Sequence, residues 1–339
     1  MATVVVAGGT GGIGRTIVEE LVQQGKHKVL ILSRKTSTVL GLESVPVLEA
    51  NYSDSVTVKK ILQDYNVEVV ISALALFTED SAKAQIKLIN AAIESGTVKR
   101  FIPSEYGINY SHPELIDFHP AAKWWLNAAD ALRASHLDFT RIIFGWLLDH
   151  YGFPHRKSHM RPFKFAVDFD NRRAALPGDG NTTVTFLHSV DIAKYIAALL
   201  DEGNKWPEFS AFASDKMSWN ELVKVAEKVI GEKWDVTYEP LEQLERGEPT
   251  LFEQPEGSYD LPEEVVRGMV AEYGIMAIKG VMDVSREGIR NKEFPQVKPV
   301  TVEGIIKEAW ESAKSIAVAA ESQSSFSLNE ISGDTLTYK

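Results

Sequence analysis

Apolar positions in the first 145 residues follow two alternating patterns. Short apolar runs, rich in β-branched residues, alternate with longer segments in which apolar residues recur every three to four positions. The runs predict buried strands and the segments predict amphipathic helices. The expected strands are 3–6, 28–32, 45–48, 67–71, 99–102 and 138–144, and the helices between them are 13–22, 55–64, 81–95 and 120–134. Six strands separated by helices predict an α/β fold with a Rossmann-type doubly wound parallel sheet.

The pattern becomes irregular beyond residue 145, where aromatic residues and prolines crowd a long segment. A hairpin-like turn is expected at 176–181, with strands at 182–187, 209–213 and 236–238 and helices at 192–200, 218–230, 261–273 and 302–313. We predict that residues 1–150 with 183–200 form the sheet domain. Residues 151–182 with 201–314 are expected to form a smaller α+β substrate-binding lobe. The serine- and alanine-rich residues 315–339 predict a mobile tail.

Five glycines follow the first predicted strand, in the sequence TVVVAGGTGGIGR at residues 3–15. They satisfy two spacings, Gly9-x-Gly11-x-x-Gly14 and Gly8-x-x-Gly11-x-x-Gly14. A strand, a glycine turn and a helix start are typical of a dinucleotide site, because backbone N–H groups at the helix N-terminus meet a pyrophosphate that no Cβ keeps away. The expected cofactor contacts in this turn are Gly8, Thr10, Gly11, Gly12, Ile13 and Gly14.

Two basic residues, Arg34 and Lys35, follow the second predicted strand. An NAD-preferring site would place an acid there, about 20 residues past the last motif glycine, to hold the ribose 2′-hydroxyl. A guanidinium can instead clamp a 2′-phosphate through a charge-assisted pair, so NADP(H) is preferred over NAD. The alternative is a solvated pair of charges at a strand end.

Further cofactor contacts are expected where other strands end. Asn51 follows the third strand and would lie near the adenine, although it is as readily a plain turn residue. The small residues Ser72 and Ala73 end the fourth strand and would let the cofactor approach. Ser104, Glu105 and Tyr106 follow the fifth strand and are expected to point toward the same crevice, because ligands bind beyond the carboxyl ends of the strands of such sheets. Of these three, Ser104 is the expected cofactor contact.

Bulk composition excludes several classes of function. The net charge of −11 gives no positive field to attract nucleic acid. The absence of cysteine excludes disulfides, thiolate nucleophiles and cysteine-based zinc sites, and His150, His155 and His159 have no acids at metal-ligand spacing. No stretch reaches the roughly 18 apolar residues that a membrane span needs, and no signal peptide is recognisable. We therefore expect a cytoplasmic protein without a membrane or metal partner.

Four motifs together resemble a known family. They are GGTGGIG at the start, Arg34 after the second strand, KRFIPSEYG at 99–107, and a helical Lys123 before LDFTRIIFGW. The chain resembles the NmrA-like, isoflavone-reductase-like branch of the short-chain dehydrogenase superfamily, which includes phenylcoumaran benzylic ether and pinoresinol-lariciresinol reductases. The resemblance is continuous over roughly residues 3–200 and weaker to about 310. It implies that Arg34 contacts the 2′-phosphate and that Lys123 is catalytic and contacts the cofactor.

The chain departs from the Tyr-x-x-x-Lys motif of ordinary short-chain enzymes. Four residues before Lys123 stands His119, and Tyr106 occupies a position where the related reductases more often have phenylalanine. Lys123 could therefore act alone or through water, His119 could donate a proton near neutral pH, or the hydroxyl of Tyr106 could do so. The competing interpretations are a structural histidine at a helix start and a surface lysine.

The sequence thus predicts an NADPH-dependent reductase that transfers hydride to an aromatic or conjugated small molecule. Tyr106, Trp124, Trp146 and Phe163 are the expected substrate contacts, since long aromatic loops after such a sheet often form a substrate wall. A redox-sensing regulator that binds NAD(P) without turnover, as the resemblance to NmrA implies, is the alternative function. A second copy of the chain is an open alternative to a monomer.

Overall fold

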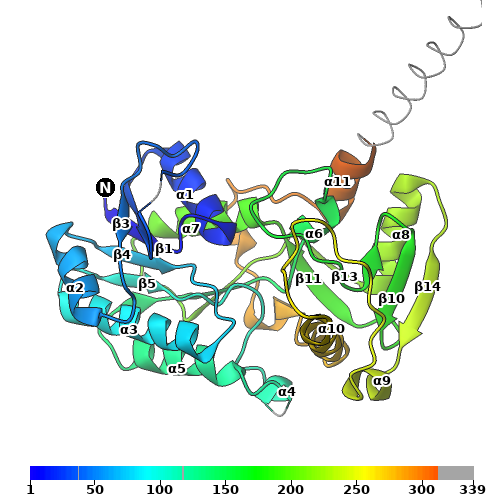
Figure 1. Cartoon of the computed structure of the whole chain (residues 1–339). Coiled ribbons are helices and arrows are strands. Elements are labelled where there is room, and N and C mark those ends of the chain that lie inside the picture. Colours follow the sequence, from blue (N-terminus) through cyan, green and yellow to red (C-terminus); the bar gives the residue numbers. More distant parts are fainter. Residues whose placement is uncertain (37, 117, 312–339) are drawn as a thin grey trace, which may run out of the picture.

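The computed structural model describes residues 1–36, 38–116 and 118–311 of the 339-residue chain. The tail expected at 315–339 lies outside the described residues. Figure 1 shows the chain running from a layered sheet and helix assembly at the N-terminus into a second group of smaller sheets and helices.

The N-terminal assembly is built on a parallel sheet of six strands in the order β3-β2-β1-β4-β5-β6. This order confirms the predicted doubly wound sheet, whose direction of winding reverses between β1 and β4. The register pairs Val5 with Leu30 on one side and with Val70 on the other. The strands are β1 (Thr3–Ala7), β2 (Lys28–Ser33), β3 (Val47–Glu49), β4 (Val69–Ser72), β5 (Arg100–Ile102) and β6 (Asp138–Phe139).

Helices cover both faces of this sheet because its strands are apolar on both faces. On one face Val4, Val6 and Ile31 pack against α1 (Gly12–Gln24) and α7 (Ser189–Leu200). On the other face, side chains such as Val5 and Leu30 pack against three helices, which lie below the sheet in Figure 1. They are α2 (Ser55–Asp64), α3 (Glu79–Ser95) and α5 (Ala122–Arg133). A short helix, α4 (Pro113–Ile116), precedes α5.

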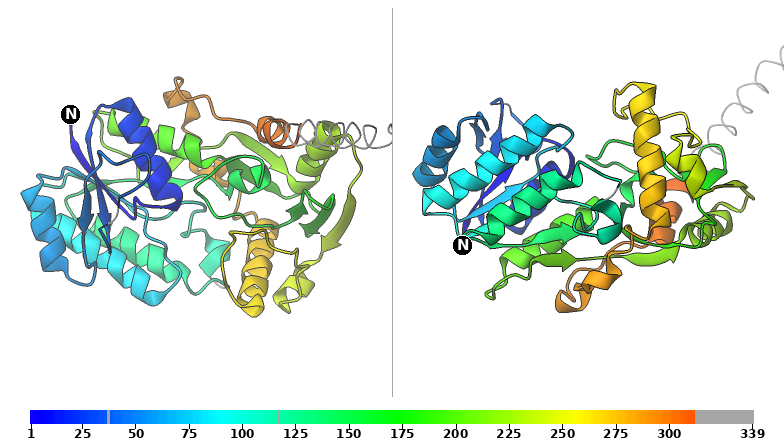
Figure 2. Two further views of the ribbon diagram at one scale, coloured as in Figure 1. Left: turned by 45° about the horizontal axis from the view of Figure 1, so that its top comes forward. Right: turned by 90° about the horizontal axis from the view of Figure 1, so that it is seen from below.

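The rest of the chain forms three smaller sheets. They have the orders β14-β10-β9, β13-β11-β8 and β12-β7. Their strands are β7 (Arg141–Ile143), β8 (Trp146–Leu147), β9 (Val167–Asp168), β10 (Arg173–Pro177), β11 (Thr183–Leu187), β12 (Phe209–Ala211), β13 (Asp215–Ser218) and β14 (Asp235–Glu239). The accompanying helices are α6 (Asp149–Gly152), α8 (Trp219–Ile230), α9 (Leu241–Glu245), α10 (Glu263–Ile278) and α11 (Val302–Ile306), with short turns η1 (Val284–Glu287), η2 (Asn291–Glu293) and η3 (Lys307–Glu311). The right-hand view of Figure 2 shows α10 as a long helix crossing the edge of this group.

Three sequence predictions differ from the structure. The strand expected at 138–144 is divided, because β6 closes the large sheet whereas β7 leaves it to pair with β12. The turn at 176–181 does not make a hairpin, because β10 and β11 pair in different sheets. The last helix is α-helical only to Ile306 and widens into the π-helical turn η3.

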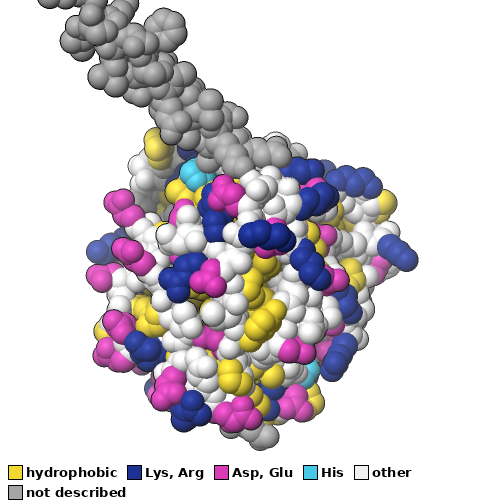
Figure 3. Space-filling model, turned by 90° about the vertical axis from the view of Figure 1, so that its right-hand side faces the viewer, with side chains coloured by type: hydrophobic (Ala, Val, Ile, Leu, Met, Phe, Trp, Pro, Cys, Tyr) yellow, Lys and Arg dark blue, Asp and Glu magenta, His cyan; other side chains and the backbone are white. Residues whose placement is uncertain are grey.

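The apolar clusters cross the domain boundaries that the sequence suggests. Val184 and Phe186 of β11 pack with Trp146 and Trp219, in the cluster of the smaller sheets. Trp206 and Phe294, by contrast, pack with α1 and α7 against the large sheet, although both lie in the range expected for the smaller lobe. The division of the chain into two domains therefore stays a prediction. Figure 3 shows basic and acidic side chains interspersed over the face at the right-hand side of Figure 1.

Candidate functional site

The glycine turn between β1 and α1 is closely packed against the end of β4. A Cβ on Gly8 would lie 2.6 Å from the Ala73 carbonyl oxygen, and one on Gly14 would lie 2.4 Å from the Gly8 carbonyl oxygen. The Ala73 N–H also donates to the carbonyl of Ala7, at 2.7 Å. Gly8, Gly14 and Ala73 therefore bring three backbone segments together at the point where the sheet reverses.

The other side of the same turn is open. A Cβ on Gly11 or Gly12 would have no heavy atom within 4 Å, and Gly12 has a φ of +51°, which favours glycine. Gly11 is the N-cap residue of α1, no side chain caps the helix, and its first turn carries no acidic residue. Half-buried Thr10 and Ile13 flank the opening. A helix N-terminus with space in front of it fits a pyrophosphate, so the residues of the turn suit the cofactor that the sequence predicts.

Arg34 and Lys35 lie immediately after β2, and both side chains are exposed. Arg34 is close to Tyr52, whose hydroxyl donates to the carbonyl of Leu32 at 2.7 Å. Burial raises the pKa of Tyr52, and the positive charge of Arg34 opposes that rise. An exposed guanidinium next to the carboxyl edge of the sheet is free to meet a phosphate group.

Asn51 forms part of a turn in the structure. Its side-chain carbonyl accepts the N–H of Ser53 at 3.0 Å, and its backbone carbonyl accepts the N–H of Asp54 at 2.9 Å. Asp54 then caps α2 by accepting the N–H groups of Val56 and Thr57. The turn accounts for the local role of Asn51, and its predicted contact with the adenine remains a prediction.

The segments after β4 and β5 are tied together by side chains that the sequence singled out. The Tyr106 hydroxyl donates to the Ser72 carbonyl at 3.0 Å, and the Ser104 hydroxyl donates to the Leu74 carbonyl at 2.8 Å. The Ser104 N–H donates to buried Gln85 of α3 at 2.7 Å. Burial raises the pKa of Tyr106 far above its ordinary value. These bonds hold the segments after β4 and β5 together, and they already engage the Tyr106 hydroxyl.

A buried ion pair holds the segment that follows β5. The guanidinium of Arg141 on β7 donates two hydrogen bonds to Glu105, at 2.5 and 2.6 Å, and a third to Glu208 at 3.1 Å. Both Arg141 and Glu105 are buried. Burial raises the pKa of Glu105 to about 7, and the hydrogen bonds and charge of Arg141 oppose the rise.

Lys123 and His119 face different neighbours. Lys123 in the first turn of α5 is exposed and within electrostatic reach of Glu79 at the start of α3. The pKa of Glu79 is lowered chiefly by its hydrogen bond with Lys83, with a smaller contribution from the charge of Lys123. His119 lies before α5 and is hydrogen-bonded through Nδ1 to Glu272 of α10, at 3.0 Å. The structure thus separates the environments of two side chains that are only four positions apart.

Aromatic rings surround His119. The ring centroids of Tyr110 and Trp125 are 3.9 Å apart in a stacked pair, and both lie about 6 Å from the centroid of the His119 ring, at 5.9 and 6.1 Å. Trp124, an expected substrate contact, is half-buried, and its centroid lies 6.0 Å from that of Trp125. This cluster lies in the segments that follow the carboxyl end of β5.

Two other expected substrate contacts lie in a packed core. Trp146 and Phe163 are 8% and 5% exposed, and both contact Tyr273 of α10, with centroid distances of 5.3 and 6.0 Å. Both rings pack against the same tyrosine, and their predicted contact with substrate stays a prediction.

Sequence reasoning missed the contribution of α10. Glu272 and Tyr273 lie on a helix for which the sequence predicted no role, and Tyr110 was likewise not singled out. Each of these residues is ordinary in its local sequence context, and only the folded chain brings Glu272, 153 positions away, to His119. The sequence held no signal that could have identified this contact.

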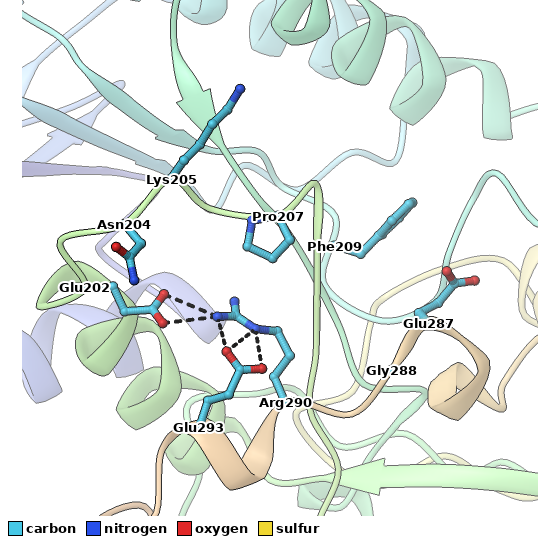
Figure 4. Close-up of a pocket in the computed structure, with 9 residues that line it drawn as sticks. All are labelled: Glu202, Asn204, Lys205, Pro207, Phe209, Glu287, Gly288, Arg290 and Glu293. Atoms are coloured by element: carbon cyan, nitrogen blue, oxygen red, sulfur yellow. Dashed lines mark hydrogen bonds and ion pairs between the residues drawn. The ribbon is translucent and has the colours of Figure 1, made fainter.

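A hollow lies near the start of β12 and is lined by residues from the segments 202–209 and 287–293 (Figure 4). The guanidinium of Arg290 in this hollow is paired with Glu202 and Glu293, so its positive charge is compensated.

Within the ranges that the structure describes, no cluster of three histidine or acidic side chains could hold a metal ion. No helix in the described part of the chain is long and apolar enough to cross a membrane.

Comparisons with known sequences give matches over most of the chain. A model of the NmrA-like family matches residues 1–304. The oxidoreductase swnN of Metarhizium robertsii is 32% identical over 334 residues, which cover 91% of this chain and 98% of the relative. Phenylcoumaran benzylic ether reductase IRL1 of Ginkgo biloba is 25% identical over 324 residues, which cover 90% and 98%.

Solved structures share the fold. Leucoanthocyanidin reductase from Vitis vinifera, in a binary complex with NADPH, gives a TM-score of 0.70 at 22% identity. The structure described as AtPrR2 with NADP+ and (+)-pinoresinol gives a TM-score of 0.66, also at 22% identity. Each comparison covers 90% of this chain and 98% of the other. The curated relatives are named as oxidoreductases or reductases.

Proposed function

Because the chain belongs to the NmrA-like family, we propose that it is an NADPH-dependent reductase that transfers hydride to an aromatic or conjugated small molecule. The observation that carries the proposal is the open N-terminus of α1 beside exposed Arg34. Its relatives that are named oxidoreductases support the class of reaction.

Different residues would hold different parts of the cofactor. Gly11 and Gly12 leave space for the pyrophosphate in front of α1, while Arg34, with Lys35 beside it, would hold the 2′-phosphate. Ser72, Ala73 and Ser104 line the approach at the ends of β4 and β5. When bound, the reduced nicotinamide supplies a hydride to an electrophilic carbon of the acceptor.

The remaining site residues belong to the part of the site proposed to hold the nicotinamide end of the cofactor, beyond the carboxyl ends of β4 and β5. Lys123, His119 and Tyr106 are the candidate sources of the balancing proton. Trp124, Tyr106, Trp146 and Phe163 are the aromatic side chains proposed to accommodate the acceptor. In this arrangement the smaller sheets and α10 serve as the substrate-binding lobe.

Binding measurements test the cofactor assignment. The wild-type protein should bind NADPH more tightly than NADH, and Arg34→Ala should weaken NADPH binding by about 10- to 100-fold, because a charge-assisted phosphate contact contributes roughly 1.5–3 kcal/mol. NADH binding should be unchanged in that variant. Lys60→Ala is a matched control, because Lys60 is an exposed lysine on α2 paired with Asp64. Equal affinities for the two cofactors in the wild type would contradict the role of Arg34.

Turnover distinguishes the reductase from a redox sensor. Stopped-flow oxidation of NADPH should occur with at least one member of a panel of aromatic ketones, enones, imines and benzylic ethers. Tight cofactor binding with no oxidation across the whole panel would instead support the NmrA-type sensor.

A further inference from the structure

A hydrogen bond joins two elements that lie far apart in the sequence. His119, in the turn between α4 and α5, is bonded through Nδ1 to Oε1 of Glu272, in the last part of α10. The two residues are separated by 153 positions, and the distance between the two atoms is 3.0 Å. The bond thus connects the segment after β5 with the helix that packs on the aromatic core.

The chemistry of the carboxylate fixes the proton arrangement of the ring. An ionised carboxylate can only accept, so the Nδ1 atom of His119 must carry the proton of this bond. The His119 side chain is only 12% exposed, and the rings of Tyr110 and Trp125 are its neighbours, with centroids 5.9 and 6.1 Å away and interplanar angles of 32° and 33°. Glu272 and the two aromatic rings therefore hold the imidazole in one orientation.

The second ring nitrogen is left without a partner. The Nε2 atom of His119 is buried and has no hydrogen-bond partner among the described residues, and the same is true of Nε1 of neighbouring Trp124. Buried polar atoms in proteins are usually hydrogen-bonded, and exceptions occur at functional sites. A ligand atom between these elements would satisfy Nε2.

The other two candidate donors lack this combination. The Tyr106 hydroxyl already donates to the Ser72 carbonyl, and Lys123 is exposed beside Glu79. Only His119, of the three, has both a carboxylate that orients it and a ring nitrogen that is buried and unpaired.

We propose that His119 is the proton donor of the reductase and that Glu272, from α10, is its positioning residue. The proposal rests on the proposed function.

The acceptor carbon of a C=X group, where X is the atom that becomes protonated, gains hydride from the reduced nicotinamide dinucleotide. The π electron pair moves to X, and Nε2–H of the imidazolium delivers its proton to X. The products are the reduced C–XH group, the oxidised dinucleotide, and a neutral imidazole that keeps Nδ1–H on Glu272. Water then restores the proton to the ring.

Steady-state kinetics test the pair. Glu272→Gln should lower kcat by about 10- to 100-fold, the range typical of groups that orient a catalytic histidine, with little change in KM. Glu272→Asp should recover part of that loss. His119→Gln should lower kcat at least as much, and adding Glu272→Gln to it should cost nothing further, because the two residues act as one unit. Glu264→Gln is the control, since Glu264 is an exposed glutamate on the same helix.

A spectroscopic measurement tests the pair without turnover. In the free wild-type protein, ¹⁵N NMR of the neutral His119 ring should give a protonated signal for Nδ1 and an unprotonated one for Nε2. Glu272→Gln should bring the two signals together, because the neutral amide can accept from Nδ1 or donate to it. A protonated Nε2 in the wild type, or a kcat unchanged in Glu272→Gln, would overturn the proposal. If no acceptor oxidised NADPH while the NMR result held, the proposed function would fail and the contact between His119 and Glu272 would stand.

Discussion

At the scale of single residues, the glycines at positions 8–14 differ in how much space surrounds them, and their spacing in the sequence does not show this difference. Gly8 and Gly14 are required because neighbouring backbone atoms occupy the space where a Cβ would lie, at 2.6 and 2.4 Å. Gly11 has open space at that position. The same residue type is therefore required by packing at two positions, whereas at Gly11 packing does not require it.

Alanine substitutions should distinguish these positions. Gly14→Ala should lower the free energy of unfolding by at least about 2 kcal/mol, because its Cβ would overlap the Gly8 carbonyl. Gly11→Ala should change that free energy by less than about 1 kcal/mol and yet weaken NADPH binding by about tenfold or more. Urea unfolding and fluorescence titration provide the two measurements. Equal destabilisation by both substitutions would contradict this division.

Burial of a histidine makes stability depend on pH. Burial lowers the pKa of His150 from 6.5 to about 4, against the opposing charge of Asp149. The folded state therefore binds this proton less readily than the unfolded state. The resulting stability is complete above about pH 6.5 and is lost as the pH falls from 6.5 toward 4. We expect a loss of about 3 kcal/mol over that interval. The loss should be smaller in His150→Gln and unchanged in His136→Gln, where the ring is exposed.

At the scale of elements, helix α3 positions the segment that follows β5. Gln85 is buried on α3, and its side-chain carbonyl accepts the Ser104 N–H. Ser104 in turn donates to Leu74 after β4. Helix α3 therefore holds the segments that follow two neighbouring strands, β4 and β5.

Removing this support should affect both stability and binding. Gln85→Leu leaves the Ser104 N–H buried without an acceptor, which should lower the free energy of unfolding by about 1–3 kcal/mol and also weaken NADPH binding. Gln63→Leu is the matched control, because Gln63 makes one hydrogen bond to the Ser95 carbonyl at an exposed position. Denaturant unfolding and cofactor titration of the two variants provide the comparison. Wild-type affinity in Gln85→Leu would argue against a role for α3 in forming the site.

At the scale of the whole molecule, one buried arginine joins the two groups of sheets. Arg141 lies on β7, which pairs with β12, and it bonds Glu105 beyond the large sheet and Glu208 before β12. It also lies over the ring of Phe209, 4.4 Å from the centroid. The two groups of elements therefore share a charged contact as well as apolar clusters.

Breaking this contact should destabilise the entire chain. Arg141→Met leaves the Glu105 carboxyl buried without its partner and should lower the free energy of unfolding by about 3–5 kcal/mol. Replacing both residues, as Arg141→Met with Glu105→Leu, should recover most of the loss. Arg133→Met, which removes a more exposed partner of Glu208, should cost less than about 1 kcal/mol. Thermal unfolding measures all three, and an equal loss in the single and double variants would contradict this account.

The sequence by itself determined the six-stranded sheet, the glycine turn, the position of Arg34 and the family. The predicted sheet and family are confirmed. The glycine turn and Arg34 enter the proposed function. They depend on local patterns, since strand and helix periods and a glycine turn are written in neighbouring residues. Only the tertiary structure decided that β7 leaves the large sheet, that Trp146 and Phe163 lie in a packed core, and that Glu272 meets His119. Such contacts join residues from distant parts of the chain, and they depend on how helices and sheets pack.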